Sequence, residues 1–344
     1  MSASRRRFLA LSGAVGIFSF FRNIPTVISK AFACMPTTAD VLGPFNNSIV
    51  ANRFFKQNFT KKALVIFAKD MLRIKKLPEE FQTAFTNAGC IIEVVEKKLT
   101  ASLANEQFKK PWIQVLPSFV AALPKTLIIE INPILKPDYI SQNVVGMVAG
   151  WSGSDSCLMV TAHYDHLGRL GKDAYFAGAN DNASGVSMLI ELISYFNRQG
   201  NQPKYNIVFV AFSAEEAGLI GSHYFVQHPL VELSKIKFLV NLDLLGTGDD
   251  GLMVVNGAVH TSQFELLQKI NTQHNYLPAI KKRGKAANSD HYWFSEQGVP
   301  AFFFYTLGGV SHYHDVLDVP RTLPLTKYKQ VYSLLVDFLE EQGR

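Results

Sequence analysis

Acidic residues and histidines follow strand-like apolar runs in five short blocks of the chain. The blocks span residues 162–166, 179–185, 214–218, 241–243 and 313–315. A buried strand that ends in a carboxylate or an imidazole points that group at something beyond the strand. Both groups are good ligands for divalent metal ions, so two such ions are the simplest common target. Each block alone has a simpler explanation, such as a structural histidine or a solvated acidic pair, and only their order and context favour a metal site.

Strand and helix patterns alternate along most of the chain. Apolar runs predict strands at 144–149, 158–162, 207–212, 238–242, 252–255 and 300–305. Helical spacing of apolar residues predicts helices at 183–197, 262–272 and 326–340. This alternation predicts an α/β fold in which a mostly parallel mixed sheet carries helices on both faces. Ligands bind beyond the carboxyl ends of the strands in such folds, which is where the five blocks fall.

The net charge of +6 comes mostly from one end of the chain. The first 33 residues hold five basic residues and no acidic one, and the remainder has 29 basic residues against 28 acidic ones. The remainder therefore lacks the excess positive charge that binds nucleic acid, and we expect no nucleic-acid partner.

Residues 1–33 have the features of an export signal of the twin-arginine type. Arg5 and Arg6 precede a mostly apolar run, and an A-x-A cleavage pattern ends at Ala33. Arg22 interrupts the apolar run well before the roughly 20 residues that a membrane span needs. We therefore expect an exported protein, periplasmic or extracellular, without a membrane-spanning helix.

The three cysteines include no CxxC pair, so they indicate neither a zinc–thiolate site nor a disulfide framework. Cys34 directly follows the cleavage pattern, which leaves a lipid anchor at Cys34 open as an alternative. Ala31 argues against lipidation, because it occupies the position at which a lipoprotein signal usually has leucine. Cys157 begins a strand pattern and is expected to be a small core residue.

The blocks resemble those of the zinc exopeptidase family that contains bacterial leucyl aminopeptidases, glutamate carboxypeptidase and the transferrin receptor. The resemblance covers residues 144–320. It rests on AHYDHLG (162–168), GANDNASG (178–185), AEEAGLIGS (214–222), NLDLLG (241–246), NSDHYWF (288–294) and YHDVLDV (313–319). It implies a zinc-exopeptidase-like fold and a zinc-dependent hydrolase that removes residues from the ends of peptides.

By that resemblance, five residues hold two Zn²⁺ ions in each chain. His163, Asp181 and Asp243 bind one ion, and Asp181 bridges to a second ion that Glu216 and His314 also bind. Imidazole nitrogen and carboxylate oxygen suit zinc, and each ion keeps an open position for water or substrate.

The resemblance also implies three catalytic roles. Glu215 is the general base, which takes a proton from the metal-bound water and gives it to the leaving amine. Tyr313 stabilises the oxyanion, with Tyr305 as a weaker alternative. Asp165 lies two residues after His163 on the same strand face, so we expect it to hold that imidazole.

Three further histidines lie in or beside the blocks. His166 and His291 are expected to shape the pocket or to support the ligands. His312 lies two residues before His314, and the spacing to Asp318 favours His314 as the ligand.

Residues 34–140 are predicted to form a small α/β unit in front of a catalytic domain over residues 141–344. Its strand patterns are at 63–68, 90–95, 112–115 and 126–131, with a helical pattern at 78–88. The unit loosely resembles the protease-associated domain inserted in some exopeptidases. Two prolines mark the boundary between the two parts.

These features predict a secreted two-zinc aminopeptidase that acts on peptides with a free N-terminus, with metal-bound hydroxide as the nucleophile. The alternatives are a glutaminyl cyclase of the same fold, which uses one zinc, and a carboxypeptidase. Arg283 is the feature that would favour the carboxypeptidase if it reached the site. A non-catalytic receptor is the least favoured alternative, because that branch has lost metal ligands whereas the full set is present here.

Overall fold

The computed structural model describes residues 63–71, 79–103, 110–121, 139–170 and 174–343. The expected export signal, Cys34 and the strand expected at 126–131 lie outside these residues. Within the described ranges, none of the helices is both long and apolar enough to cross a membrane.

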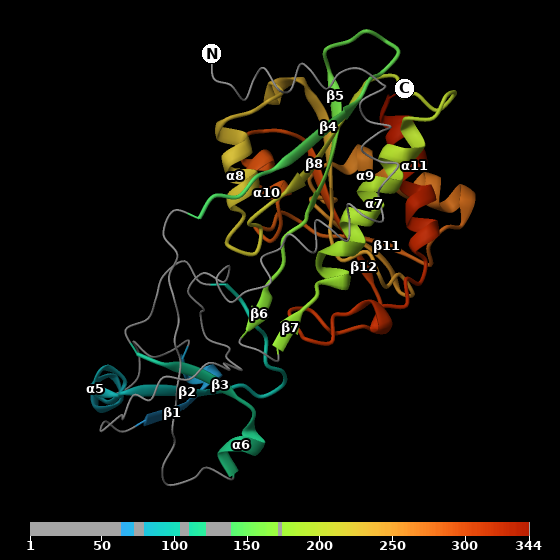
Figure 1. Ribbon diagram of the computed structural model, residues 1–344. Helices are drawn as coiled ribbons and strands as arrows, with labels where there is room; N and C mark the ends of the chain where they lie inside the picture. The colour runs from blue at the N-terminus through green and yellow to red at the C-terminus, as the bar shows by residue number, and fades with distance from the viewer. Residues whose placement is uncertain (1–62, 72–78, 104–109, 122–138, 171–173, 344) are drawn as a thin grey trace.

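A seven-stranded sheet lies at the centre of the larger part of the molecule (Figure 1). Its strands are β4 (Val144–Val148), β5 (Cys157–His163), β8 (Asn206–Phe212), β9 (Ile236–Leu242), β10 (Gly251–Val255), β11 (Ile280–Lys282) and β12 (Ala301–Leu307). They lie in the order β11-β10-β12-β9-β5-β8-β4. The inner strands β12, β9, β5 and β8 are parallel, whereas β4 and β10 pair antiparallel with β8 and β12. The expected mostly parallel mixed sheet is confirmed.

Helices cover both faces of this sheet (Figure 1). The helices are α7 (Gly185–Phe196), α8 (Ile220–Gln227), α9 (Thr261–His274), α10 (His291–Glu296) and α11 (Tyr328–Gly343). Side chains of α7, α9 and α11 form one core with the sheet, and those of α8 and α10 form a second core. Successive residues of β5 alternate between the two, because Val160 lies in the first core and Met159 in the second.

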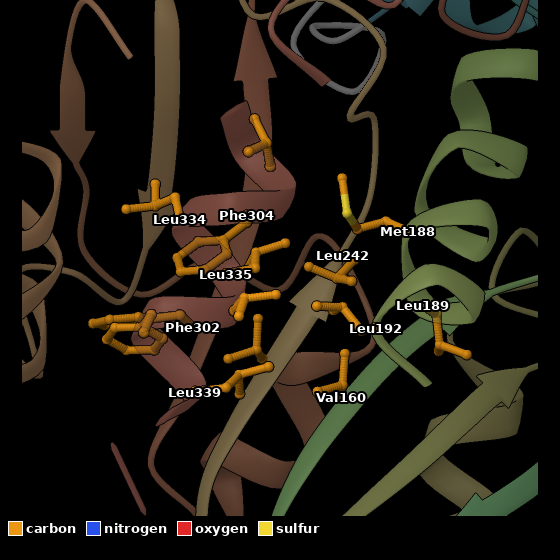
Figure 2. Packing of buried hydrophobic residues seen from close by; sticks show 14 of the residues in the cluster. Val160, Met188, Leu189, Leu192, Leu242, Phe302, Phe304, Leu334, Leu335 and Leu339 are labelled. Carbon is orange, nitrogen blue, oxygen red and sulfur yellow. The ribbon is translucent and has the colours of Figure 1, made fainter. Parts of the chain in front are cut away.

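The two cores explain why the sequences of the inner strands are continuous apolar runs. All seven residues of β5 are buried, since both faces of the strand are covered. Figure 2 shows Val160, Leu242 and Phe302 from the strands packed against side chains of α7 and α11. This packing fixes the strands, and with them the positions at which the strands end.

A second, three-stranded parallel sheet is built from β1 (Ala63–Phe67), β2 (Cys90–Val94) and β3 (Trp112–Val115), in that order. Its helices are α4 (Ala68–Met71), α5 (Glu79–Asn87) and α6 (Pro117–Ala121). These elements match the strands expected at 63–68, 90–95 and 112–115 and the helix expected at 78–88.

A short antiparallel hairpin lies between the two sheets (Figure 1). It consists of β6 (Gly168–Leu170) and β7 (Ala174–Phe176), and it directly follows the block that contains His163. The sequence patterns do not predict this hairpin, because its strands are only three residues long.

Candidate metal centre

The segments that carry the expected metal ligands meet at one edge of the large sheet. His163 is the last residue of β5, and Asp243 directly follows β9. Glu216 lies just beyond β8, and His314 lies in the loop after β12. Because these inner strands are parallel, their carboxyl ends lie side by side and bring the four side chains together.

The fifth residue, Asp181, comes from the turn η3 (Ala179–Ser184), which leads into α7. The Nε2 atom of His163 lies 3.3 Å from Asp181 Oδ1 and 3.4 Å from Asp243 Oδ1. Two ligands about 2.1 Å from one tetrahedral zinc ion lie about 3.4 Å from each other, so this spacing fits a shared zinc ion.

The hydrogen bonds of this group point the same way. His163 Nε2, Asp181 Oδ2 and Asp243 Oδ1 are buried, and each lacks a hydrogen-bond partner among the described residues. His163 Nε2 and Asp243 Oδ1 face each other, whereas Asp181 Oδ2 faces His314. Buried polar atoms are nearly always paired, so unpaired atoms gathered in one region indicate ligands of cations. The residues present therefore fit a zinc ion here.

A second group shares Asp181 with the first. His314 Nε2 lies 3.3 Å from Asp181 Oδ2 and 3.0 Å from Glu216 Oε2. One carboxylate oxygen of Asp181 thus faces His163 and the other faces His314. Asp181 has the position that a carboxylate bridging two ions requires.

His166 was expected to shape the pocket or to support the ligands, but it lies in direct contact with the second group. Its Nδ1 atom lies 2.7 Å from Glu216 Oε1 and 4.0 Å from Asp181 Oδ1, so the three side chains also form a possible ligand group. The ring fits because residue 178 is glycine. A Cβ atom at Gly178 would lie 2.7 Å from Cγ of His166, and its φ of 67° also favours glycine.

Asp165 contacts His163 differently from the expectation. The Nδ1 atom of His163 lies 3.1 Å from the backbone carbonyl of Asp165, and the carboxylate Oδ1 is 3.8 Å away. The carboxylate instead accepts hydrogen bonds from the backbone N–H groups of Glu215 at 3.1 Å and Glu216 at 3.2 Å. Asp165 therefore holds both the first imidazole and the turn that carries the adjacent glutamates.

Two residues with supporting contacts were not identified from the sequence. Asp318 accepts hydrogen bonds from the backbone N–H groups of Asn180 at 2.8 Å and Asp181 at 3.0 Å. Ser289 donates to Asp243 Oδ2 at 3.3 Å. In the sequence, Asp318 only favoured His314 over His312 as the ligand, and Ser289 was only a member of a motif block, so neither had an assigned role.

Left-handed backbone conformations cluster at the site. Ala214 has a φ of 58°, Leu244 of 55° and His314 of 51°. Residues other than glycine seldom adopt such angles, and they persist where the surrounding structure holds them. Ala214 directly precedes Glu215, Leu244 directly follows Asp243, and His314 itself carries one of the imidazoles.

Negative charge accumulates around Glu215. Burial raises the pKa of Glu215 to about 9, and the carboxylates of Asp290, Asp243 and Glu216 act in the same direction, against His163. Burial likewise raises the pKa of the Asp290 carboxyl to about 7. Asp290 was also missed in the sequence. A bound cation would offset this accumulated charge, which is a second reason for expecting metal here.

A pocket opens onto the two groups. It is lined by Asp181, Glu215, Asp243, Leu244, Asn288, Phe303, Tyr305, Tyr313 and His314. Tyr313 is 53% exposed as a residue, and its ring stacks on His314 with 3.8 Å between ring centroids. Arg283 Nη1 lies 3.4 Å from the Tyr305 hydroxyl, which places this cation near the pocket wall. His291 is buried against Phe303 and does not line the pocket.

Comparison with known proteins identifies the family. The model for peptidase family M28 matches residues 143–339. The chain belongs to peptidase family M28. This membership confirms the resemblance that the motif blocks indicated.

Two curated M28 relatives align with about half of the chain. Leupeptin-inactivating enzyme 1 of Streptomyces exfoliatus is 32% identical over 162 residues, which are 45% of this chain and 34% of that protein. Aminopeptidase YwaD of Bacillus subtilis is 29% identical over 178 residues, which are 48% of this chain and 35% of that protein. The chain thus spans about a third of the length of either relative.

The same fold occurs in a solved structure. A zinc aminopeptidase from Bacillus subtilis superposes with a TM-score of 0.62 at 21% identity, covering 87% of this chain and 75% of that one. This likeness confirms the fold expected for an M28 peptidase.

Removal of metal from this M28 centre should destabilise the protein. A chelator would leave the buried carboxylates of Asp181, Glu216 and Asp243 without a cation, and bound metal stabilises a fold by roughly 4 kcal/mol at a thousandfold excess over its dissociation constant. We expect the thermal midpoint to fall with a zinc chelator and to recover when zinc is added. Asp181→Ala is the control, since it should shrink this difference. Equal midpoints with and without chelator in the unmodified protein would contradict a metal centre.

Proposed function

We propose that this M28 peptidase is a two-zinc aminopeptidase that removes N-terminal residues from peptides. The observation that supports it most directly is the position of Asp181. Its two carboxylate oxygens each lie 3.3 Å from a different imidazole, that of His163 and that of His314. A carboxylate in this position can hold two ions about 3.5–4 Å apart.

In this proposal, His163, Asp181 and Asp243 hold the first zinc ion, and Asp181, Glu216 and His314 hold the second. Zinc ions bound there would activate a water molecule and polarise the peptide carbonyl. His166 is assigned as the hydrogen-bond partner of Glu216, because its Nδ1 atom is only 2.7 Å from Oε1. That contact would leave Glu216 Oε2 directed at the second ion.

Glu215 is proposed as the general base. Its side chain lines the pocket, and its neighbour Glu216 faces the second ion, so one turn can serve both roles. Asp165 fixes that turn through the two backbone N–H groups. Glu215 would take the proton of the attacking water and deliver it to the leaving amine.

Tyr313 is proposed to stabilise the oxyanion. It lines the pocket and its ring stacks on His314, and these contacts support a phenol that could reach a substrate carbonyl in the pocket. Burial and the nearby carboxylates, Asp181 first among them, raise the pKa of Tyr313. The hydroxyl therefore keeps its proton and can donate it in a hydrogen bond.

The aminopeptidase direction rests on charge. Among the described residues that line the pocket there is no lysine or arginine that could hold a terminal carboxylate, which favours a substrate bound by its α-amine. Arg283 is exposed and contacts the pocket wall at Tyr305, which argues against a direct role in binding a terminal carboxylate. Because this cation is still near the pocket, a carboxypeptidase is the alternative to test. A one-zinc glutaminyl cyclase is the second alternative, against which the shared position of Asp181 argues.

The export signal and the division of the chain are part of the proposal. Residues 1–33 are proposed to direct export to the periplasm or the cell exterior, with lipidation at Cys34 as the alternative. Residues 34–140 are proposed as a separate unit and 141–344 as the catalytic domain, to which the family match at 143–339 lends support.

Glu215→Gln should lower kcat by roughly 10²–10⁴-fold and leave the zinc content unchanged, because the residue handles protons and does not bind metal. Asp181→Ala, as the comparison, should lose zinc and activity together. Steady-state kinetics and elemental analysis of both variants test the assignment. A near-normal kcat for Glu215→Gln would show that another group is the base.

Aminoacyl-nitroanilides with a free amine should be hydrolysed, and their N-acetylated forms should not, because acetylation removes the free α-amine that an aminopeptidase requires. Rates on both series, measured side by side with N-blocked dipeptides that have a free C-terminus, decide the direction. If those blocked dipeptides were cleaved at a comparable rate, the carboxypeptidase alternative would replace the proposal, and Arg283 would be the first residue to substitute.

A further inference from the structure

A segment between β2 and β3, residues 98–103, lies against the loop that carries His314. The ammonium group of Lys98 donates to the backbone carbonyls of Ser311 at 2.8 Å and Tyr313 at 2.7 Å. It also lies 3.3 Å from a carboxylate oxygen of Asp315. Two hydrogen bonds and one ion pair therefore let this side chain hold the loop at three points.

A second contact reaches His314 directly. The N–H of Ala101 donates to the backbone carbonyl of His314 at 3.3 Å, and Nδ1 of the imidazole lies 2.8 Å from the carbonyl of Ala101. Because a carbonyl can only accept a hydrogen bond, Nδ1 must carry the proton. In the neutral ring, Nε2 then carries the lone pair that can bind a metal ion, and this is the atom that faces Asp181 and Glu216.

The segment is also anchored on the hairpin that follows the first ligand block. Ala101 is buried in a small apolar cluster, and Leu103 packs against it. The other members come from the hairpin and the residue before it, and they are Leu167, Leu170, Ala174 and Phe176. Figure 1 shows this hairpin, β6 and β7, between the two sheets. The segment therefore bridges two loops that carry site residues.

The loop needs such support. His314 has a φ of 51°, in the left-handed region that residues other than glycine seldom adopt. A residue keeps such a conformation only when contacts from its surroundings hold it. Lys98 contacts the residues directly before and after His314, and Ala101 contacts His314 itself. These contacts come from a distant part of the chain, since Ala101 and His314 are 213 residues apart.

We propose that the 98–103 segment is a positioning element of the zinc centre, which holds His314 in the orientation that binds the second ion. Lys98 and the Ala101 carbonyl are its positioning groups, and neither lines the pocket. The inference rests on the proposed function, because it takes His314 as a zinc ligand. It assigns to the region before the family match a part in metal binding, in addition to any part in stability.

Lys98→Met in the full-length, zinc-loaded protein tests this inference. Loss of a group that orients a metal ligand typically costs 10–100-fold in metal affinity. We expect one of the two zinc ions to pass to a chelator about tenfold faster or more than in the unmodified protein. Activity should fall at low free zinc and recover at high zinc. Lys98→Arg, which keeps a cationic donor, should restore slow release. Lys98→Gln, which keeps a neutral donor, replaces the methionine variant if that variant does not fold.

Lys110→Met is the matched control. Lys110 also donates to two backbone carbonyls, those of Phe85 at 2.8 Å and Thr86 at 2.9 Å, and both lie in the region of the small sheet. The control should lower thermal stability without changing zinc release. If Lys98→Met released zinc at the unmodified rate, or if Lys110→Met accelerated release equally, the positioning role would be refuted. Failure of the proposed function would be distinct, because the unmodified protein would then bind fewer than two zinc ions or cleave no peptide.

Discussion

The structure depends on one electrostatic constraint, the gathering of carboxylates at the carboxyl ends of buried strands. Asp181, Glu216 and Asp243 are almost fully removed from water, and Glu215 lines the same pocket. Ionised groups buried in this way cost several kcal/mol each unless a counter-charge compensates them. The imidazoles beside them are fewer than the carboxylates, so bound cations would offset charge that protonation must otherwise remove, as the raised pKa of Glu215 indicates. A seven-stranded sheet with a core on each face provides a frame rigid enough to keep these groups together.

The proposed zinc ligands are held in place largely by backbone groups. His163 faces the carbonyl of Asp165, and His314 faces the carbonyl of Ala101, so both rings direct Nε2 at the centre. Two carboxylates that do not face the centre serve the turns instead. Asp165 binds the N–H groups of the turn that follows β8, and Asp318 binds those of the turn before α7. Among the described residues, His163 Nε2, Asp181 Oδ2 and Asp243 Oδ1 thus remain unpaired while hydrogen bonds hold the groups around them.

Much of this arrangement follows from the sequence, and the limits have a physical cause. Buried strands read as apolar runs, and parallel strands end at one edge, so residues that end such runs were expected to meet there, as His163 and Asp243 do. The contact of Ala101 with His314 had no signature, because any residue has a backbone carbonyl and 213 residues separate the two. The sequence also could not predict that Asp165 uses its carbonyl for His163 and its carboxylate for the next turn. The residue type alone does not determine which of the two groups contacts which partner.

The central claim is that two ions share Asp181. Anomalous diffraction at the zinc absorption edge, from crystals of the zinc-loaded protein, tests it most directly. The account predicts two peaks about 3.5–4 Å apart, one beside His163 and Asp243 and the other beside Glu216 and His314, with Asp181 between them. A single peak, or two peaks that Asp181 does not join, would contradict it.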